Sequence, residues 1–388
     1  MKTVQLKSSN GYRNDVSVER FAIGDLAVAD NVDVDETGKT WRRLGTEQIA
    51  NAVVHSLKGF GDFGLAVVNG VLSHITEDGA TTPLVSGIKD RVCYVLLNGH
   101  VYWSDGVRTG AIIGTQAESW GVSVPSLPAV ASTNVVGGAQ IMYTMTYVKH
   151  SGLESGAPLA GVTDERNTTF IDIPVPTDPA VVAKRLYMSA PNGETLYLAA
   201  ELPVAQTTFI APAAGPKLVA LRTQFMGPPP AGEVLGYFNG RLYVGAGRFL
   251  WYSQPYEYEL FDLTSGFIVL DSNIRTISPV NTGIFVGTET ETMFLQGTDP
   301  SEFVRIKAAP YGTVLGTEAE VRNDILLEKG AQGMSPVWMS KTGLCLGQEG
   351  GSVLNLTSQR FIMPPVSEGA SLMKIRSGTP QLISTLFA

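Results

Sequence analysis

Three carboxylates and two tyrosines gather in one short stretch of the sequence. Glu257, Glu259 and Asp262 lie beside Tyr256 and Tyr258. Two carboxylates near a bound sugar are what a retaining or inverting glycoside hydrolase needs, one of them as an acid and the other as a base or nucleophile. The solvated end of a β-strand would show the same pattern without any chemistry. We favour the strand end and keep the sugar site as an alternative.

A second acidic group lies near the N-terminus. Asp33, Asp35 and Thr37, followed by Gly38, look like the start of a calcium-binding loop. Such a loop needs a bidentate glutamate at its twelfth position, where this chain has Leu44. We therefore expect the turn of a β-hairpin here and no calcium site.

The overlapping segment 36–41 is close to the Asp-box turn of sialidase-like propellers. Glu36 stands where that turn has its aspartate, Val34 stands where it has its serine, and no second copy occurs in the chain. This is weak support for a glycosidase.

Other patterns that carry catalysis are missing. The sequence has no nucleophile elbow, phosphate loop or dinucleotide fingerprint, and the segment 245–247 is too short to cradle a phosphate. The histidines have no metal-ligand spacing such as His-Glu-x-x-His. We expect no enzyme, with no catalytic, cofactor-binding or metal-binding residues and no cofactor. The residues considered and set aside are His55, His74, His100 and His150, and Cys93 and Cys345, which we expect to be reduced and buried.

Composition limits the class of protein. Charged residues make up 16% of the 388 residues, against about 25% in typical globular chains. The 42 glycines and 22 prolines indicate many short strands and few surface helices. A formal net charge of -8 argues against a general nucleic-acid-binding surface. No apolar run approaches the ~20 residues of a membrane span, and the N-terminus lacks the pattern of a signal peptide, so we expect folding in a cytoplasm and no membrane insertion.

A recurring phrase organises the chain. Residues 236–253 read as strand, Asn239-Gly240 turn, strand, second glycine-rich turn and third strand. An Asn-Gly pair between alternating apolar residues is the strongest short-range signal for a two-residue hairpin. The phrase recurs at 64–75 and 92–106 and, in weaker form, at 280–287 and 339–347. Such repetition predicts an all-β protein and specifically a β-propeller.

A different pattern interrupts the repeats. Between proline-rich segments at 125–128 and 212–230, the chain has longer alternating strands. This part resembles a fibronectin type III-like β-sandwich, through Tyr147, the segments 152–155 and 185–187, and the Asn192-Gly193 turn. We therefore expect an N-terminal arm and the first blades in 1–125, the inserted sandwich in 126–213 and the remaining blades in 214–388. Six or seven blades of about 40–45 residues would result, and the N- and C-terminal strands would close the ring.

One more resemblance bears on function. The segment 29–38 with 41–45 has the pattern Asn-Val-Asp, turn, Gly, Arg-Arg, Gly, which is similar to propeller-type tail hub or nozzle proteins of short-tailed (podovirus-like) bacteriophages. Those proteins usually have Arg-Arg-Pro-Gly where this chain has Leu44 in place of the proline. The phrases at 238–243, 251–253 and 256–262 look like blades of the same family.

The resemblance implies a structural virion protein of the phage tail that is assembled in the host cytoplasm. Its subunits would form a ring, typically a homohexamer, below the portal and adaptor, with tail fibres or spikes as further partners. The ring would extend the DNA channel, retain the packaged DNA and open for ejection, with only transient, non-specific passage of DNA. The acidic balance agrees with a conduit that does not bind its cargo.

Two alternatives remain open. The first is a propeller-type phage tail protein that binds or cleaves glycans for host attachment, with Glu257, Glu259 and Tyr256 at its site. The second is a bacterial propeller-type scaffold protein.

Overall fold

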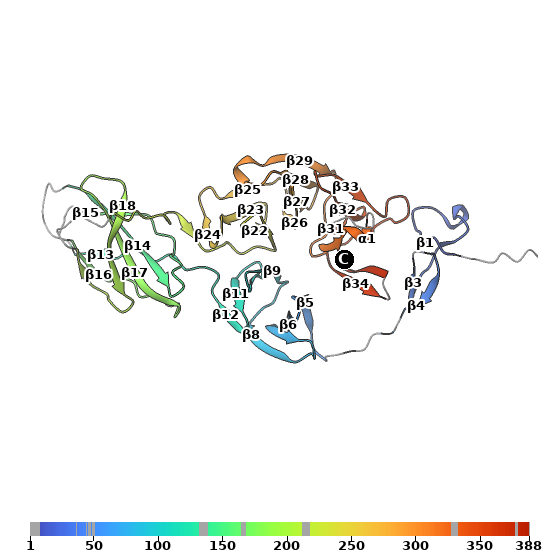
Figure 1. Cartoon of the computed structure of the whole chain (residues 1–388), viewed down its shortest axis with the longest axis horizontal. Coiled ribbons are helices and arrows are strands. Elements are labelled where there is room, and N and C mark those ends of the chain that lie inside the picture. Colours follow the sequence, from blue (N-terminus) through green and yellow to red (C-terminus); the bar gives the residue numbers. More distant parts are fainter. Residues whose placement is uncertain are drawn as a thin grey trace, which may run out of the picture. The chain divides into compact units, whose positions relative to one another are not determined.

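The computed structural model describes residues 8–35, 37–43, 45, 48, 51–131, 139–163, 168–211, 218–326, 333–376 and 379–387 (Figure 1). The protein is all-β: the helical segments of this part are a single turn, α1 (Asn323–Leu326), and two short 3-10 segments, η1 (Val18–Arg20) and η2 (Pro300–Glu302). In the residues described, no helix is both long and apolar enough to span a membrane. The chain forms two compact units, one of residues 1–54 with 270–388 and one of residues 55–269.

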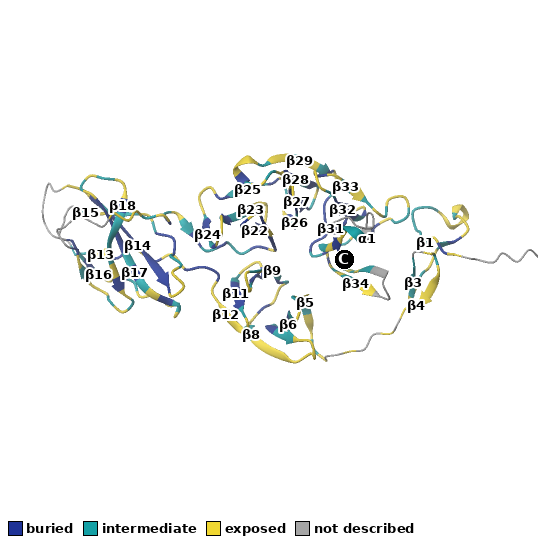
Figure 2. Ribbon diagram, viewed as in Figure 1, coloured by how far each residue is buried: buried dark blue, intermediate teal, exposed yellow. Residues whose placement is uncertain are grey.

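The unit of residues 55–269 begins with two antiparallel sheets of four consecutive strands each. They pack on each other through a core that includes Leu65, Leu72, Val101 and Trp103. The last strand of each sheet is largely exposed, whereas the middle strands are buried (Figure 2). The first sheet consists of β5 (Val54–Gly59), β6 (Phe63–Val68), β7 (Val71–Thr76) and β8 (Thr81–Ser86), and the second of β9 (Cys93–Leu97), β10 (His100–Ser104), β11 (Thr109–Ile113) and β12 (Gln116–Glu118).

Two sheets then enclose a separate core and form a β-sandwich. The core lies between them and contains Tyr143, Met145, Phe170 and Leu186. The four-stranded sheet has the order β15 (Gly161–Thr163), β14 (Ile141–Lys149), β17 (Val181–Ser189) and β18 (Leu196–Pro203). The three-stranded sheet has the order β13 (Ala129–Val130), β16 (Thr169–Ile171) and β19 (Phe209–Ile210).

The sandwich is fastened to the rest of its unit where the chain enters and leaves it. On the way in, the Trp120 Nε1 atom donates a hydrogen bond of 2.9 Å to the Tyr258 carbonyl. Where the chain leaves the sandwich, the Thr223 carbonyl accepts a hydrogen bond of 3.1 Å from the N–H of Ala157, which lies between β14 and β15. The backbone at Gly156 passes so close to Met226 that there is no room for a Cβ atom. Both connections therefore hold the sandwich in place.

The third repeat phrase forms the next sheet. Its face packs against the second sheet through Tyr102, Leu242, Val244 and Phe261. The sheet has six strands: β20 (Met226–Gly227), β21 (Val234–Phe238), β22 (Arg241–Ala246), β23 (Phe249–Gln254), β24 (Glu257–Asp262) and β25 (Phe267–Val269).

The unit that contains residues 270–388 has two further four-stranded sheets and a hairpin. Phe285, Phe294, Trp338 and Cys345 form the core between the two sheets. The sheets are β26 (Ile274–Val280), β27 (Gly283–Thr288), β28 (Thr292–Gln296) and β29 (Val304–Ala309), and then β30 (Ala319–Arg322), β31 (Met334–Ser340), β32 (Gly343–Gly347) and β33 (Val353–Asn355). The hairpin of β34 (Glu368–Arg376) and β35 (Thr379–Phe387) packs Met373 and Leu382 on the second of these sheets.

The Asn-Gly hairpin turns predicted in the three strongest repeat phrases are confirmed. At Asn69, Asn98 and Asn239 the φ angles are 49°, 52° and 43°, and each following glycine has a φ of 78–79°. Two successive positive φ angles define the type I′ turn, which matches the twist of the strands that it joins. The flanking residues pair directly, as Phe238 does with Arg241.

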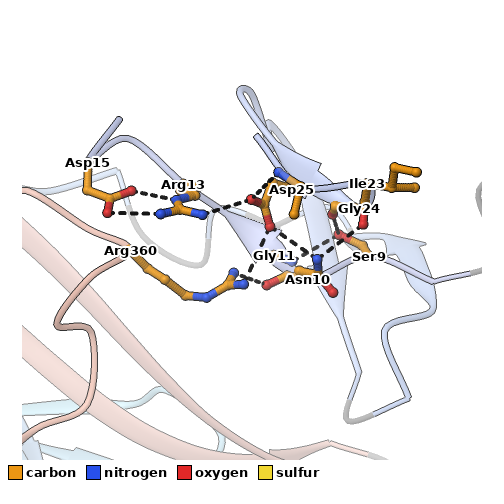
Figure 3. Close-up of polar contacts among 10 residues, drawn as sticks. Ser9, Asn10, Gly11, Arg13, Asp15, Ile23, Gly24, Asp25 and Arg360 are labelled. Atoms are coloured by element: carbon orange, nitrogen blue, oxygen red, sulfur yellow. Dashed lines mark hydrogen bonds and ion pairs between the residues drawn. The ribbon is translucent and has the colours of Figure 1, made fainter. Parts of the chain in front are cut away.

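The N-terminal segment forms two small sheets, β1 (Gly11–Tyr12) with β2 (Asp25–Leu26) and β3 (Val32–Val34) with β4 (Thr40–Arg42). Polar contacts hold it on the segment 360–362 of the same unit, and Figure 3 shows those made by Arg360. Arg360 donates to the Asn10 carbonyl and pairs with Asp25 at 3.4 Å, and Arg13 pairs with Asp25 at 3.2 Å. The Asp25 side chain is completely covered. We call these contacts, with the hydrogen bonds between Asn14 and Ile362 at 2.6 and 3.1 Å, the N-terminal clasp.

Two expectations concern the number of blades and the closure of the ring. The described residues contain five antiparallel repeat sheets and the separate hairpin of β34 and β35, and six or seven blades stay a prediction. Each of the five sheets is built from strands of one stretch of chain, so no N-terminal strand pairs into a C-terminal sheet in the part described. Instead of a shared sheet, the side-chain and backbone polar groups of the clasp join the N-terminal segment to the segment 360–362.

Replacing Arg360 by glutamine is expected to loosen the clasp. Trypsin should then cut at Arg13, Arg20 and Arg42 roughly five- to tenfold faster, because the charged hydrogen bonds of Arg360 are lost and cleavage follows the population of the open form. Mass spectrometry of a limited digest measures this rate. The control is Arg322→Gln, which removes an exposed arginine that pairs with Asp324. Equal rates in both variants would contradict a holding role for Arg360.

Candidate functional site

The acidic and aromatic stretch of the sequence lies on β24, beside the second sheet. The Tyr102 hydroxyl on β10 donates a hydrogen bond of 2.7 Å to Glu259 Oε1 on β24. The same hydroxyl lies 3.4 Å from His100 Nδ1. Burial raises the pKa of the Tyr102 phenol, and the neighbouring Glu259 carboxylate raises it further. One oxygen of this carboxylate is therefore already engaged by a phenol that stays protonated.

A group of tyrosines surrounds the start of β24. The Tyr237 and Tyr258 rings meet edge to face, with centroids 6.2 Å apart. Burial raises the pKa of the Tyr258 phenol, and the nearby phenols of Tyr237 and Tyr256 add to the effect, while a hydrogen bond with the Asn98 side chain opposes it. The Asn98 side chain of the second sheet therefore lies beside Tyr258 of the third.

Tyr256 is the most exposed of these rings. It sits in the two-residue turn between β23 and β24, which is closed by the pairing of Gln254 with Glu257. Its N–H donates to the Gly240 carbonyl at 2.7 Å. Its ring lies against Gly240, where a Cβ atom would be 3.0 Å from the ring atoms Cε1 and Cζ. Even so, 76% of Tyr256 is exposed.

The structure separates the three predicted carboxylates. Glu259 contacts Tyr102, Glu257 is exposed at the start of β24, and Asp262 at its other end closes a local turn. The Asp262 carboxylate accepts hydrogen bonds from Thr264 and Ser265 at 2.5–3.1 Å. Burial would raise its pKa, but these hydrogen bonds outweigh burial and lower it to about 2. Asp262 thus has a structural role in the turn, as the strand-end interpretation predicts.

The sequence does not predict three residues that lie near β24 in the structure. Asn98, Tyr102 and Tyr237 belong to repeat phrases and carry no spacing signal that links them to β24. Only the packing of the second sheet against the third brings them together.

The histidines and cysteines occupy unrelated places. In the residues that the structure covers, no group of three His, Cys, Asp or Glu side chains could hold a metal ion. His74 stacks on Phe63 at 5.0 Å, and His55 Nδ1 lies 2.9 Å from the Ser56 hydroxyl. Cys345 is buried, which raises the pKa of its thiol, whereas Cys93 is only half-buried, contrary to the prediction.

The acidic group near the N-terminus forms a hairpin turn, as predicted. Asp35 Oδ1 accepts hydrogen bonds from the Thr37 N–H and hydroxyl and the Lys39 N–H at 2.6–3.0 Å, and Oδ2 accepts from Trp41 Nε1 at 3.2 Å. Asp33 pairs with Arg43 at 3.0 Å. The two carboxylates therefore serve the turn and the strand pair. Glu36 and Leu44, named in the calcium-loop and Asp-box comparisons, lie outside the described residues.

Asp35 predicts an acid-dependent loss of stability. Hydrogen bonds from the Thr37 hydroxyl, and next from Trp41, lower the pKa of its carboxyl group to about 2 from the model-peptide value of 3.8. A lowered pKa stabilises the fold above pH ~4, and this stabilisation disappears as the pH falls through about 2. The difference in free energy of unfolding between the wild type and Asp35→Ala should therefore shrink between pH 4 and 2. The exposed Asp90→Ala is the control, and a difference for Asp35→Ala that stays constant across this range would refute the assignment.

Comparisons with known proteins identify no family. No protein-family model matches the chain, and no curated protein matches it. Solved structures match only loosely. One is a crystal structure of BBS1N in complex with ARL6DN, with 13% identity, 86% of this chain and 91% of that chain covered, and a TM-score of 0.32. A structure of S. cerevisiae Dbp5 bound to Nup159 and Gle1 has 11% identity, with 86% of this chain and 73% of that chain covered and a TM-score of 0.28. PorZ of Porphyromonas gingivalis has 13% identity, with 86% of this chain and 45% of that chain covered and a TM-score of 0.21. Likeness at this level carries no argument about the activity or partners of this chain.

Proposed function

We propose that this chain is a structural subunit of a phage tail, a hub or nozzle protein that assembles into a ring. The observation that carries the proposal is the sequence pattern of 29–45, which resembles propeller-type tail proteins of short-tailed phages. Its described part is the hairpin of β3 and β4, next to the clasped segment. We propose no catalytic role.

The proposal includes a finer description of the fold. The five repeat sheets are proposed to be the blades of a β-propeller, since each is an antiparallel sheet of successive strands. Shared cores between the first and second, the second and third, and the fourth and fifth sheets support this. The sandwich of four- and three-stranded sheets is proposed to be the fibronectin type III-like insertion.

A ring of this kind would extend the DNA channel below the portal and adaptor, retain packaged DNA and open for ejection. Its place would be the virion tail, with fibres or spikes as further partners. A net charge of -8 supports a conduit wall that repels DNA phosphates rather than binding them.

The test is mass photometry with negative-stain imaging of the purified protein, alone and with a portal–adaptor complex of the same phage. We expect rings, six-fold for a hexamer, or sixfold occupancy at the adaptor end of the complex. The portal without its adaptor is the control and should bind no rings. A protein that stays monomeric, ignores the adaptor and is missing from purified virions would rule the proposal out.

A further inference from the structure

Tyr256 occupies a turn position that is normally kept for glycine. Pro255 and Tyr256 are the central residues of the turn between β23 and β24, and Tyr256 has a φ of 62°. A turn with proline first and a positive φ second favours glycine or asparagine at the second place. A residue with a Cβ atom loses roughly 1–2 kcal/mol in this left-handed region.

Burial of the ring does not offset this cost. Tyr256 is 76% exposed, and its ring lies against Gly240. Glycine at position 256 would make a more stable turn. A strained residue that displays its side chain to solvent points to a role in binding.

Groups that form hydrogen bonds lie near the start of β24, the strand that follows Tyr256. Tyr237 is 37% exposed, and its ring meets that of Tyr258 edge to face with centroids 6.2 Å apart. The Asn98 side chain contacts the Tyr258 hydroxyl. The carboxylate of Glu257 follows Tyr256 directly and is exposed.

We propose that these residues form a binding site for a neutral glycan on the surface of the second and third sheets. The apolar face of a sugar ring would stack on the Tyr256 ring. The side chains of Asn98, Tyr237 and Glu257 would form hydrogen bonds with the hydroxyl groups of the sugar. Phosphate-bearing or other polyanionic ligands fit poorly, because Glu257 and Glu259 repel them. A protein partner fits less well, because the core of a protein interface is depleted of charged residues and a stable one needs about 800 Å² on each side.

The site binds without cleaving. A glycosidase needs two carboxylates poised on either side of one glycosidic bond. Glu259 is held by the Tyr102 hydroxyl, and Asp262 is bound in its own turn at the far end of β24. The site does not depend on assembly into a ring.

The test starts with the full-length protein on a printed array of neutral and acidic bacterial surface oligosaccharides. Calorimetry then measures the affinity for the oligosaccharide that gives the strongest signal. We expect a neutral one to bind. The Tyr256→Gly variant should lose tenfold or more in affinity while its melting temperature stays the same or rises, and Tyr256→Phe should retain most of the binding.

Phe225 offers a matched control, since it is a second exposed aromatic residue with a φ of 62°. Phe225→Gly relieves the same backbone strain elsewhere and should leave glycan affinity unchanged. An array without a neutral ligand, or a Tyr256→Gly protein that binds as the wild type does, overturns the proposal. So does a Tyr256→Gly variant that loses only adaptor binding, because Tyr256 would then contact a protein. Mass photometry of the same samples reports ring formation separately.

Discussion

Substituting alanine for Gly156 is expected to prevent folding of the unit of residues 55–269, or to destabilise it by more than about 4 kcal/mol. A Cβ atom at this position would lie 1.5 Å from the carbonyl oxygen of Met226 and 2.4 Å from its carbonyl carbon. Both are backbone atoms, so no side-chain rotation relieves the clash. The two segments would have to separate, and the hydrogen bond from Ala157 to Thr223 would break with them.

Soluble yield and thermal unfolding measure this effect. Gly59→Ala is the matched control, because nothing lies within 4 Å of the Cβ atom that it would introduce. We expect the control to unfold within about 2 °C of the wild type, as exposed substitutions away from special features usually do. A soluble Gly156→Ala protein with the same melting temperature would show that the two segments do not approach this closely.

The second large effect is expected for Phe294→Ala, at about 3–5 kcal/mol. The Phe294 side chain is completely buried between the fourth and fifth repeat sheets. Its ring centroid is 4.7 Å from that of Phe285, which in turn lies 5.4 Å from Trp338. Truncation therefore leaves a cavity in the core that joins the two sheets.

Urea unfolding measures the loss as a shift of the midpoint at an unchanged slope. Phe249→Ala is the control, because Phe249 is 37% exposed on the third sheet and its truncation should cost much less. If both variants lost the same free energy, the fourth and fifth sheets would not share this core.

Local features of the fold could be predicted from the sequence. Each Asn-Gly pair has the two residues that best tolerate positive φ, and alternation in the flanking residues supplies the strands, so the three type I′ hairpins are correct. The hairpin turn at Asp35 is correct for a similar reason, since a short carboxylate can accept the N–H groups that follow it. In both cases the residues that determine the turn lie within six positions of each other in the sequence.

Contacts between sheets could not be predicted in this way. Tyr102 and Glu259 meet across 157 positions of the sequence, and alternation in either strand says nothing about its neighbour in space. The number of blades stays a prediction: five repeat sheets are described, whereas the strands between residues 11 and 42 form two small sheets on the clasped segment. The domain boundaries at 125 and 213 and the assignment to a phage tail stay predictions.

The clasp also sets an order of events during synthesis. Each repeat sheet joins strands that are close in the chain, so it can form soon after it leaves the ribosome, when loop closure costs little. The hydrogen bonds between Asn14 and Ile362 span 348 positions and need almost the whole chain. The segment around Asn14 is thus made before the repeat sheets but docked after them, and a polypeptide truncated before residue 360 would lack the residues that hold this segment.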